Sequence, residues 1–125
     1  MFTLKTIPDH TVEVSIQVPG EDTTSTIEAT WKLHKWDDFQ ARIQAMQAGE
    51  LTDEQLVEED LINLAGIKNE NGDSMAYSPD LAAQLMQLGY VRRPLMASWF
   101  EAQQGRNKAA AKNSPAPGGG GRMLA

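Results

Sequence analysis

The sequence predicts an α+β domain: a small N-terminal antiparallel β-sheet, then about four α-helices, then a disordered C-terminal tail. Residues 12–18 alternate strictly between apolar and polar side chains, which is typical of a strand with one buried face. Residues 106–125 contain four bases, no acid and a run of four glycines, and they lack the apolar side chains that a core needs. We therefore expect a single domain over residues 1–105 and a flexible, basic tail rich in Gly, Pro and Ala over residues 106–125.

Two alternating runs near the N-terminus predict a β-hairpin. In residues 12–18 and 27–33, apolar side chains occupy every second position, so each run has one apolar face. The Pro-Gly pair at 19–20 is a turn signal between them, because proline fixes φ and glycine accepts positive φ. Phe2 and Leu4 are expected to add a short edge strand. A lone hairpin is marginal in water, so its apolar face must cover other elements.

The middle of the chain predicts two helices. The first begins at residues 36–39, where two acids favour a helix N-terminus, and it ends at Gly49. Thr52 and Gln55 match a capping box, which predicts the start of a second helix that ends at Gly66. The apolar stripe of this second helix is Leu56, Val57, Leu61 and Leu64.

Two further helices are predicted after a loop over residues 67–76. The Ser-Pro pair at 78–79 is a strong helix start, with serine as the cap and proline at the first helical position. Gly89 is expected to close this third helix. Pro94 is expected to open the last helix, and Gly105 to end it.

The charge is unevenly distributed along the chain. Residues 1–101 hold seven bases and all seventeen acids, whereas residues 102–125 hold four bases. Because an acidic body repels phosphate, this distribution argues against a domain that reads nucleic-acid sequence, although the basic tail could touch RNA or DNA weakly. The acidic run over residues 50–60 is either a docking surface for a basic partner or the solvated face of a helix.

No residue pattern in the sequence is typical of catalysis, cofactor binding or metal binding. His10 and His34 have no cysteine or second histidine at ligand spacing. Residues 69–73 resemble part of a calcium loop, but its two end positions fall on Ile67 and Ser78, which do not supply the required carboxylates. We therefore expect a protein that is not an enzyme and that has no cofactor and no metal.

The same composition predicts a location inside the cell. The chain has no cysteine, which fits a reducing compartment. Its first ten residues contain no apolar signal core, and no apolar stretch is long enough to span a bilayer. We expect a cytoplasmic protein that does not associate with membranes.

The aromatic residues predict where a partner could bind. Trp31 falls on the apolar face of its strand, so we expect it in the core. Trp99 and Phe100 are consecutive, so they cannot both point straight into one core. Either both pack at the margins of a small core, or one is left partly exposed and suits a partner. The candidate contact residues are Tyr90, Met96, Trp99 and Phe100.

Two short sequence motifs occur in this chain: Y-S-P-D-L at residues 77–81, at the start of the third predicted helix, and G-R-N-K at residues 105–108, at the end of the last predicted helix. Together with the strand pair, the capped helices and the final helix, they resemble the tail assembly chaperones of long-tailed bacteriophages and prophages. The resemblance extends over residues 3–113. One departure is Ile67, where members of that family often have an aromatic residue, usually Trp.

The resemblance implies a function without catalysis. Such chaperones bind the long tape measure protein in the cytoplasm of the bacterial host. They keep its hydrophobic helices soluble until tail tube subunits polymerise around it, and they are absent from the finished virion. A structural phage component, such as a minor tail protein or a head–tail connector protein, is the alternative.

Overall fold

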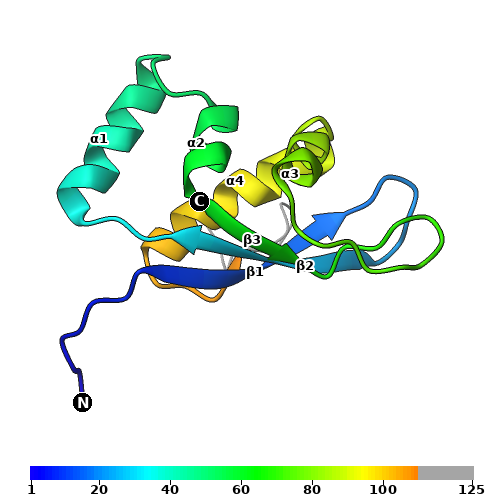
Figure 1. Ribbon diagram of the computed structural model, residues 1–125, viewed down its shortest axis with the longest axis horizontal. Helices are drawn as coiled ribbons and strands as arrows, with labels where there is room; N and C mark the ends of the chain where they lie inside the picture. The colour runs from blue at the N-terminus through cyan, green and yellow to red at the C-terminus, as the bar shows by residue number, and fades with distance from the viewer. Residues whose placement is uncertain (110–125) are drawn as a thin grey trace, which may run out of the picture.

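The computed structural model describes residues 1–109, which form a four-stranded mixed sheet and four helices (Figure 1). The elements are β1 (Asp9–Gln17), β2 (Thr24–Lys32), α1 (Trp36–Gln47), α2 (Asp53–Asp60), β3 (Leu61–Ala65), α3 (Pro79–Met86), α4 (Gly89–Gln103) and β4 (Lys108–Ala109). The strand order is β3-β2-β1-β4, with β4 parallel to β1 and the other pairs antiparallel. The predicted α+β class is confirmed. Of the predicted tail, residues 110–125 lie outside the described part of the chain.

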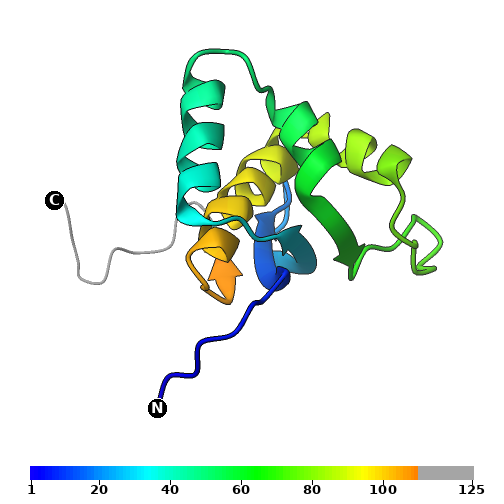
Figure 2. The ribbon, with the colours of Figure 1, turned by 60° about the vertical axis from the view of Figure 1, so that its left-hand side comes forward.

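The predicted hairpin is confirmed. β1 and β2 pair antiparallel, with Val14 opposite Ile27. The apolar side chains of both strands are buried on one face of the hairpin, and the polar side chains lie on the other face. α4 covers the apolar face (Figures 1 and 2). The buried side chains of this face are Val12, Val14, Ile16, Ile27, Ala29 and Trp31. The period of two therefore sets which face of the sheet carries the core.

The second helix is shorter than predicted, and a strand follows it. α2 ends at Asp60 and not near Gly66, and the next five residues pair with β2 as strand β3. Leu61 and Leu64 are both buried, although residues three apart in a regular strand face opposite sides. A register shift at residues 30–31 of β2 accompanies this spacing. The apolar spacing therefore imitates a helix, which is why the sequence prediction was wrong here.

The start of α3 is as predicted, whereas the boundary between α3 and α4 is not. Ser78 Oγ accepts a 3.1 Å hydrogen bond from a backbone N–H of the first turn. α3 ends at Met86, and Gly89 is the first residue of α4 instead of the end of α3. Pro94 is predicted to open α4, but it lies inside this helix. The helix begins five residues earlier, where the carbonyl of Leu88 accepts hydrogen bonds from the backbone N–H groups of residues 91 and 92.

The predicted strand at the N-terminus is absent. Residues 1–8 form no strand and lead away from the sheet (Figure 2). Phe2 and Leu4 are exposed along this segment.

The outer edge of β1 is covered by the other end of the described chain. Glu13 N donates a 2.8 Å hydrogen bond to the carbonyl oxygen of Asn107, and β4 pairs beside it. Ala109 is buried against the core. The fold therefore continues past Gly105, where the sequence placed the domain boundary, to the last described residue.

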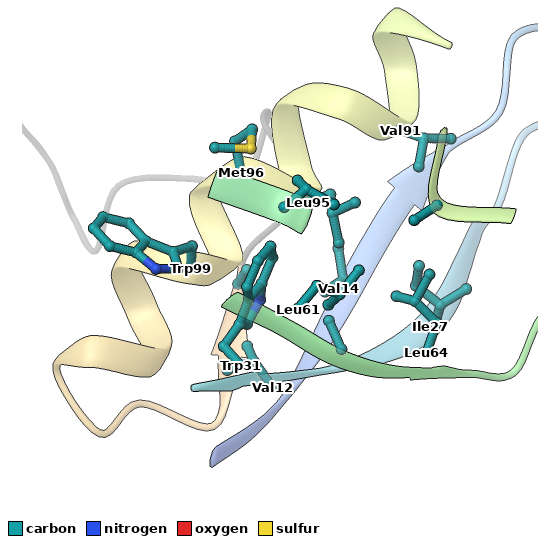
Figure 3. Packing of buried hydrophobic residues seen from close by; sticks show 14 of the residues in the cluster. Val12, Val14, Ile27, Trp31, Leu61, Leu64, Val91, Leu95, Met96 and Trp99 are labelled. Carbon is teal, nitrogen blue, oxygen red and sulfur yellow. The ribbon is translucent and has the colours of Figure 1, made fainter. Parts of the chain in front are cut away.

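The core lies between the sheet and α4 (Figure 3). Trp31 is fully buried, as predicted, and its Nε1–H donates a 2.8 Å hydrogen bond to Ser98 Oγ on α4. Ser98 Oγ in turn donates to the carbonyl oxygen of Leu95. Because each of these buried polar groups has a partner, the bond fixes the position of α4 on the sheet without an unsatisfied donor.

Candidate protein-binding surface

Four aromatic side chains gather where α1 meets the C-terminal half of α4. We call them the aromatic cluster: Trp36, Phe39, Trp99 and Phe100. Phe39 stacks on Trp99 with ring centroids 5.4 Å apart. Its centroid lies 5.5 Å from that of Trp36 and 6.4 Å from that of Phe100. These separations lie within the range of about 4.5–7 Å in which aromatic pairs attract one another.

The aromatic cluster connects the core with the surface. Trp99 is fully buried and Phe39 is half-buried, whereas Phe100 is 37% exposed and Trp36 is 68% exposed. A tryptophan exposed to this degree leaves a large apolar area in water. The cluster therefore presents an apolar surface that is continuous with the core beneath it.

The geometry of α4 explains this gradient. Consecutive residues on an α-helix point about 100° apart, so Trp99 can face inward only if Phe100 faces outward. Trp99 lies at the end of the core opposite Val91 and Ile27 (Figure 3). Its ring stands edge-on to that of Phe100, with centroids 4.9 Å apart. Of the two alternatives that the sequence left open, the structure shows the second, with Trp99 buried and Phe100 partly exposed.

A buried carboxylate lies beside the cluster. Asp60, at the end of α2, is fully buried, and its Oδ2 accepts a 2.9 Å hydrogen bond from Nε1–H of Trp99. His34 Nε2 lies 2.9 Å from the same oxygen. Since a carboxylate only accepts, His34 is the donor in this contact. Within residues 1–109, Oδ1 of Asp60 makes no hydrogen bond, and its nearest cation is Arg42 of α1, at 3.6 Å.

Arg42 also lines an open groove between α1 and the body of the protein. Its Nη2 donates a 3.0 Å hydrogen bond to Glu59 of α2. Lys32, the last residue of β2, and His34, two residues later, also line this groove. The groove is open and has a mixed polar and apolar lining. α1 contacts the body through the aromatic stack, through partly buried aliphatic side chains and through Arg42.

The acidic run over residues 50–60 does not form one uniform surface. Asp53 and Glu54, in the first turn of α2, pair with Arg92 of α4 at 3.4 and 2.7 Å. The hydrogen bond from Arg92 lowers the pKa of Glu54. The predicted capping box at Thr52 is confirmed, with both of its hydrogen bonds present. The run is thus partly structural, because four of its acids contact α1 or α4, and one of these four, Asp60, is fully buried.

Two of the four predicted contact residues lie at the surface. Tyr90 is 38% exposed and Phe100 is 37% exposed. Met96 and Trp99 are buried in the core, so neither is accessible to a partner while α1 is in the position that the structure shows. Tyr90 is ten residues before Phe100 on α4, about 15 Å along the axis, and it lies outside the aromatic cluster.

Three residues that the structure brings together, Trp36, Phe39 and Asp60, are not among the predicted contact residues. Trp36 and Phe39 are three residues apart at the start of a helix, which places them on neighbouring positions of one face. Asp60 is the last of several acids in a row, and nothing in that run marks it as the buried one. Only the pairing of β3 with β2, which turns the chain sharply after Asp60, places its carboxylate under Trp99.

The described residues offer no metal centre and no membrane-spanning helix, and they offer little to a small ligand. Residues 1–109 contain no group of three His, Asp or Glu side chains that could hold a metal ion. None of the described helices is both long enough and apolar enough to cross a bilayer. A hollow of about 170 Å³ between α2 and α3 is mainly apolar, with Val57, Ala82 and Met86 in its wall.

The comparisons with known proteins give no relative. No model of a protein family matches the chain, and neither the curated proteins nor the solved structures contain a significant match.

Proposed function

We propose that this protein binds an apolar, helical segment of another protein at the aromatic cluster. We further propose that it is a tail assembly chaperone of a long-tailed phage, which binds the tape measure protein and helps recruit tail tube subunits. The observation that carries the binding proposal is the continuous apolar surface from buried Trp99 to exposed Trp36 and Phe100. The resemblance of the sequence to such chaperones supports the choice of partner.

The energetics of aromatic surfaces favour this site over the outer face of the sheet. A partner that covers Trp36 and Phe100 removes their apolar area from water, at about 25 cal/mol per Å². Aromatic side chains also carry a large share of the binding energy at protein interfaces. The outer face of the sheet offers no comparable surface, because the side chains of β1 and β2 on that face are polar.

The charge of the body suits a protein that keeps an apolar partner in solution. All seventeen acids lie within residues 1–101, against seven bases. A complex that buries the aromatic cluster still presents this excess of negative charge to water, and the resulting repulsion opposes aggregation. The same charge attracts a helix that carries basic residues beside its apolar face.

Co-expression with the tape measure protein of the phage that encodes the chain, the partner assigned by this proposal, tests it. We expect the tape measure protein to be soluble with the wild-type chain and to aggregate with Phe100→Ala. Tyr90→Ala is the matched control, because it removes an equally exposed aromatic ring from the same helix outside the cluster. Aggregation with the wild-type chain would contradict the proposal, and equal effects of the two variants would contradict the choice of surface.

Proteomics of purified virions separates the chaperone from the alternative. A chaperone that leaves before the tail is complete is absent from the particles. A minor tail protein or a head–tail connector is present in them at a fixed stoichiometry, and this result would favour the structural alternative.

A further inference from the structure

α1 is the least buried helix of the described chain. None of its residues is buried, and its N-cap residue, Lys35, makes no side-chain capping bond. Its apolar residues Phe39, Ile43 and Met46 are only partly buried against the core. In both ribbon views α1 stands at the margin of the molecule, joined to it by connecting segments at each end (Figures 1 and 2). Little apolar burial therefore opposes its detachment.

The surface under α1 belongs to other elements and would remain in place without it. Trp99 is held by α4, and Asp60 is held between α2 and β3. The hydrogen bond between these two residues does not involve α1. Detachment of α1 would thus uncover an indole face next to a buried carboxylate, and it would leave both in their present geometry.

The side chains that α1 lays on this surface show what the surface accepts. Phe39 stacks on the indole of Trp99, and Arg42, one turn later, approaches the carboxylate of Asp60. Ile43 and Met46 continue the apolar stripe. The surface accepts a helix with an aromatic residue, a base three positions later, and aliphatic residues four and seven positions later.

We propose that α1 is an internal mimic of the partner helix, and that the partner takes the place of α1 on Trp99 and Asp60. This inference rests on the proposed function and adds the class of partner: an amphipathic helix with the aromatic–base–aliphatic pattern of α1. Phe100, beside Trp99 on α4, contacts the partner in either arrangement.

The incomplete contact of Arg42 allows a partner to compete. Nη2 of Arg42 lies 3.6 Å from Oδ1 of Asp60, and within residues 1–109 this oxygen has no hydrogen bond. A base on the partner can form a direct charge-assisted hydrogen bond there, which is stronger than the contact it replaces. A helix without a base would leave the buried carboxylate without a cation, so the surface selects against it.

Because α1 is tethered, it competes with the partner at a high effective concentration. The apparent affinity for the partner is then reduced by the fraction of molecules in which α1 is closed. A substitution that weakens α1 raises this affinity, although it removes apolar surface from the protein. If the partner instead docks on the exposed cluster with α1 in place, Phe39 is one of its contacts, and Phe39→Ala lowers the affinity for the partner.

The experiment is a titration of the full-length chain with a labelled peptide of the sequence of residues 36–47. A lactam between Asp37 and a lysine introduced by Ala41→Lys, both on the exposed face, keeps the peptide helical. We expect the chain variant Phe39→Ala to bind this peptide at least fivefold more tightly than the wild-type chain. The same substitution in the peptide should weaken binding at least tenfold. Weaker binding by the Phe39→Ala chain, or equal binding of the two peptides, would overturn the inference.

A second variant tests the contact with the carboxylate. Arg42→Glu in the chain places a like charge near Asp60, and we expect it to tighten peptide binding and to speed hydrogen exchange of the indole N–H of Trp99. Arg93→Glu is the matched control, because Arg93 is exposed on α4 and makes no ion pair within the described residues. The indole N–H of Trp31, bonded to Ser98, should keep its slow exchange and so report that the fold is intact. Equal effects of the two charge reversals would overturn the inference.

The failure of this inference can be distinguished from failure of the proposed function. If the wild-type chain keeps the tape measure protein soluble, but Phe39→Ala lowers the affinity for the peptide, the partner docks beside α1 and the internal mimic is wrong. If the peptide results are as expected, but the tape measure protein aggregates, the mimic stands and the assigned partner is wrong.

Discussion

α1 and α4 meet at the aromatic cluster, but they are attached to the protein in different ways. α4 buries six side chains against the sheet: Val91, Leu95, Met96, Ser98, Trp99 and Ala102. α1 buries none, and it reaches the core only through partly buried residues. Both helices have aromatic residues at the contact. The helices differ in how many of their other side chains are buried in the core.

This comparison separates a fixed platform from an adjustable cover. α4 is positioned by the core and by a hydrogen bond from Trp31, so the faces of Trp99 and Phe100 are set before a partner arrives. Such preorganisation reduces the entropy that binding must overcome. α1 can move at little cost in free energy. While α1 covers the apolar surface, the protein stays soluble without its partner, and when α1 moves away, the same surface is available to the partner.

The largest effect should separate the two tryptophans of the cluster. Trp99→Ala should lower the free energy of unfolding by about 3–5 kcal/mol, because it empties a large buried volume and removes one of the two hydrogen-bond donors to Asp60. Trp36→Ala, on exposed α1, should change it by less than about 0.5 kcal/mol. Urea unfolding followed by circular dichroism measures both. Similar losses for the two variants would contradict the contrast between the helices.

A smaller loss is expected from the buried carboxylate. Asp60→Ala should destabilise the protein by about 3 kcal/mol, because the donors of Trp99 and His34 lose their acceptor. Asp60→Asn is the milder comparison, since its amide oxygen can still accept one of these bonds. In urea unfolding, the free energy of unfolding should be lowest for Asp60→Ala, intermediate for Asp60→Asn and highest for the wild type. An unchanged Asp60→Ala protein would show that the carboxylate does not join α2 to α4.

Hydrogen exchange should show the contrast between the helices without any substitution. The backbone amides of α1 are expected to exchange through local opening, with a free energy at least about 1 kcal/mol below that of global unfolding. The amides in the middle of α4 should exchange only through global unfolding. Native-state exchange at several low concentrations of denaturant measures both sets, and equal values would mean that α1 and α4 open together.

The smallest effect concerns the ion pair that joins α2 to α4. The pKa of Glu54 is lowered by the hydrogen bond from Arg92, so the pair stabilises the fold above the usual pKa of a glutamate. This contribution is lost as the pH falls through the lowered value. Because the pair is exposed, Glu54→Gln should cost less than about 1 kcal/mol at pH 7 and nothing at pH 2. Glu58→Gln, at an exposed residue without an ion pair in the described chain, is the control in the same urea series.

The sequence predicted the fold best where a local signal had one meaning. The alternation in β1 and β2, the capping box of α2 and the Ser-Pro start of α3 each match a single structure. The prediction failed where a signal had two meanings. Leu61 and Leu64 have helical spacing, yet a register shift places both on the buried face of a strand.

The surface was harder to predict because it depends on contacts between distant segments. The sequence showed that Trp99 and Phe100 diverge, but not which of them faces outward. It gave no sign that Phe39, sixty residues earlier, stacks on Trp99, since only the tertiary fold brings α1 to α4. The burial of Asp60 has the same origin: Glu58 and Glu59, its acidic neighbours, are exposed, and only the turn of the chain after Asp60 distinguishes it from them.

Site-specific photo-crosslinking tests the binding surface most directly. A photoreactive phenylalanine analogue is introduced in place of Phe100 in one chain and in place of Tyr90 in another, and each chain is irradiated with the co-expressed tape measure protein. We predict a strong crosslink from position 100 and little or none from position 90. An equal or stronger crosslink from position 90 would contradict the assignment of the aromatic cluster as the surface that holds the partner.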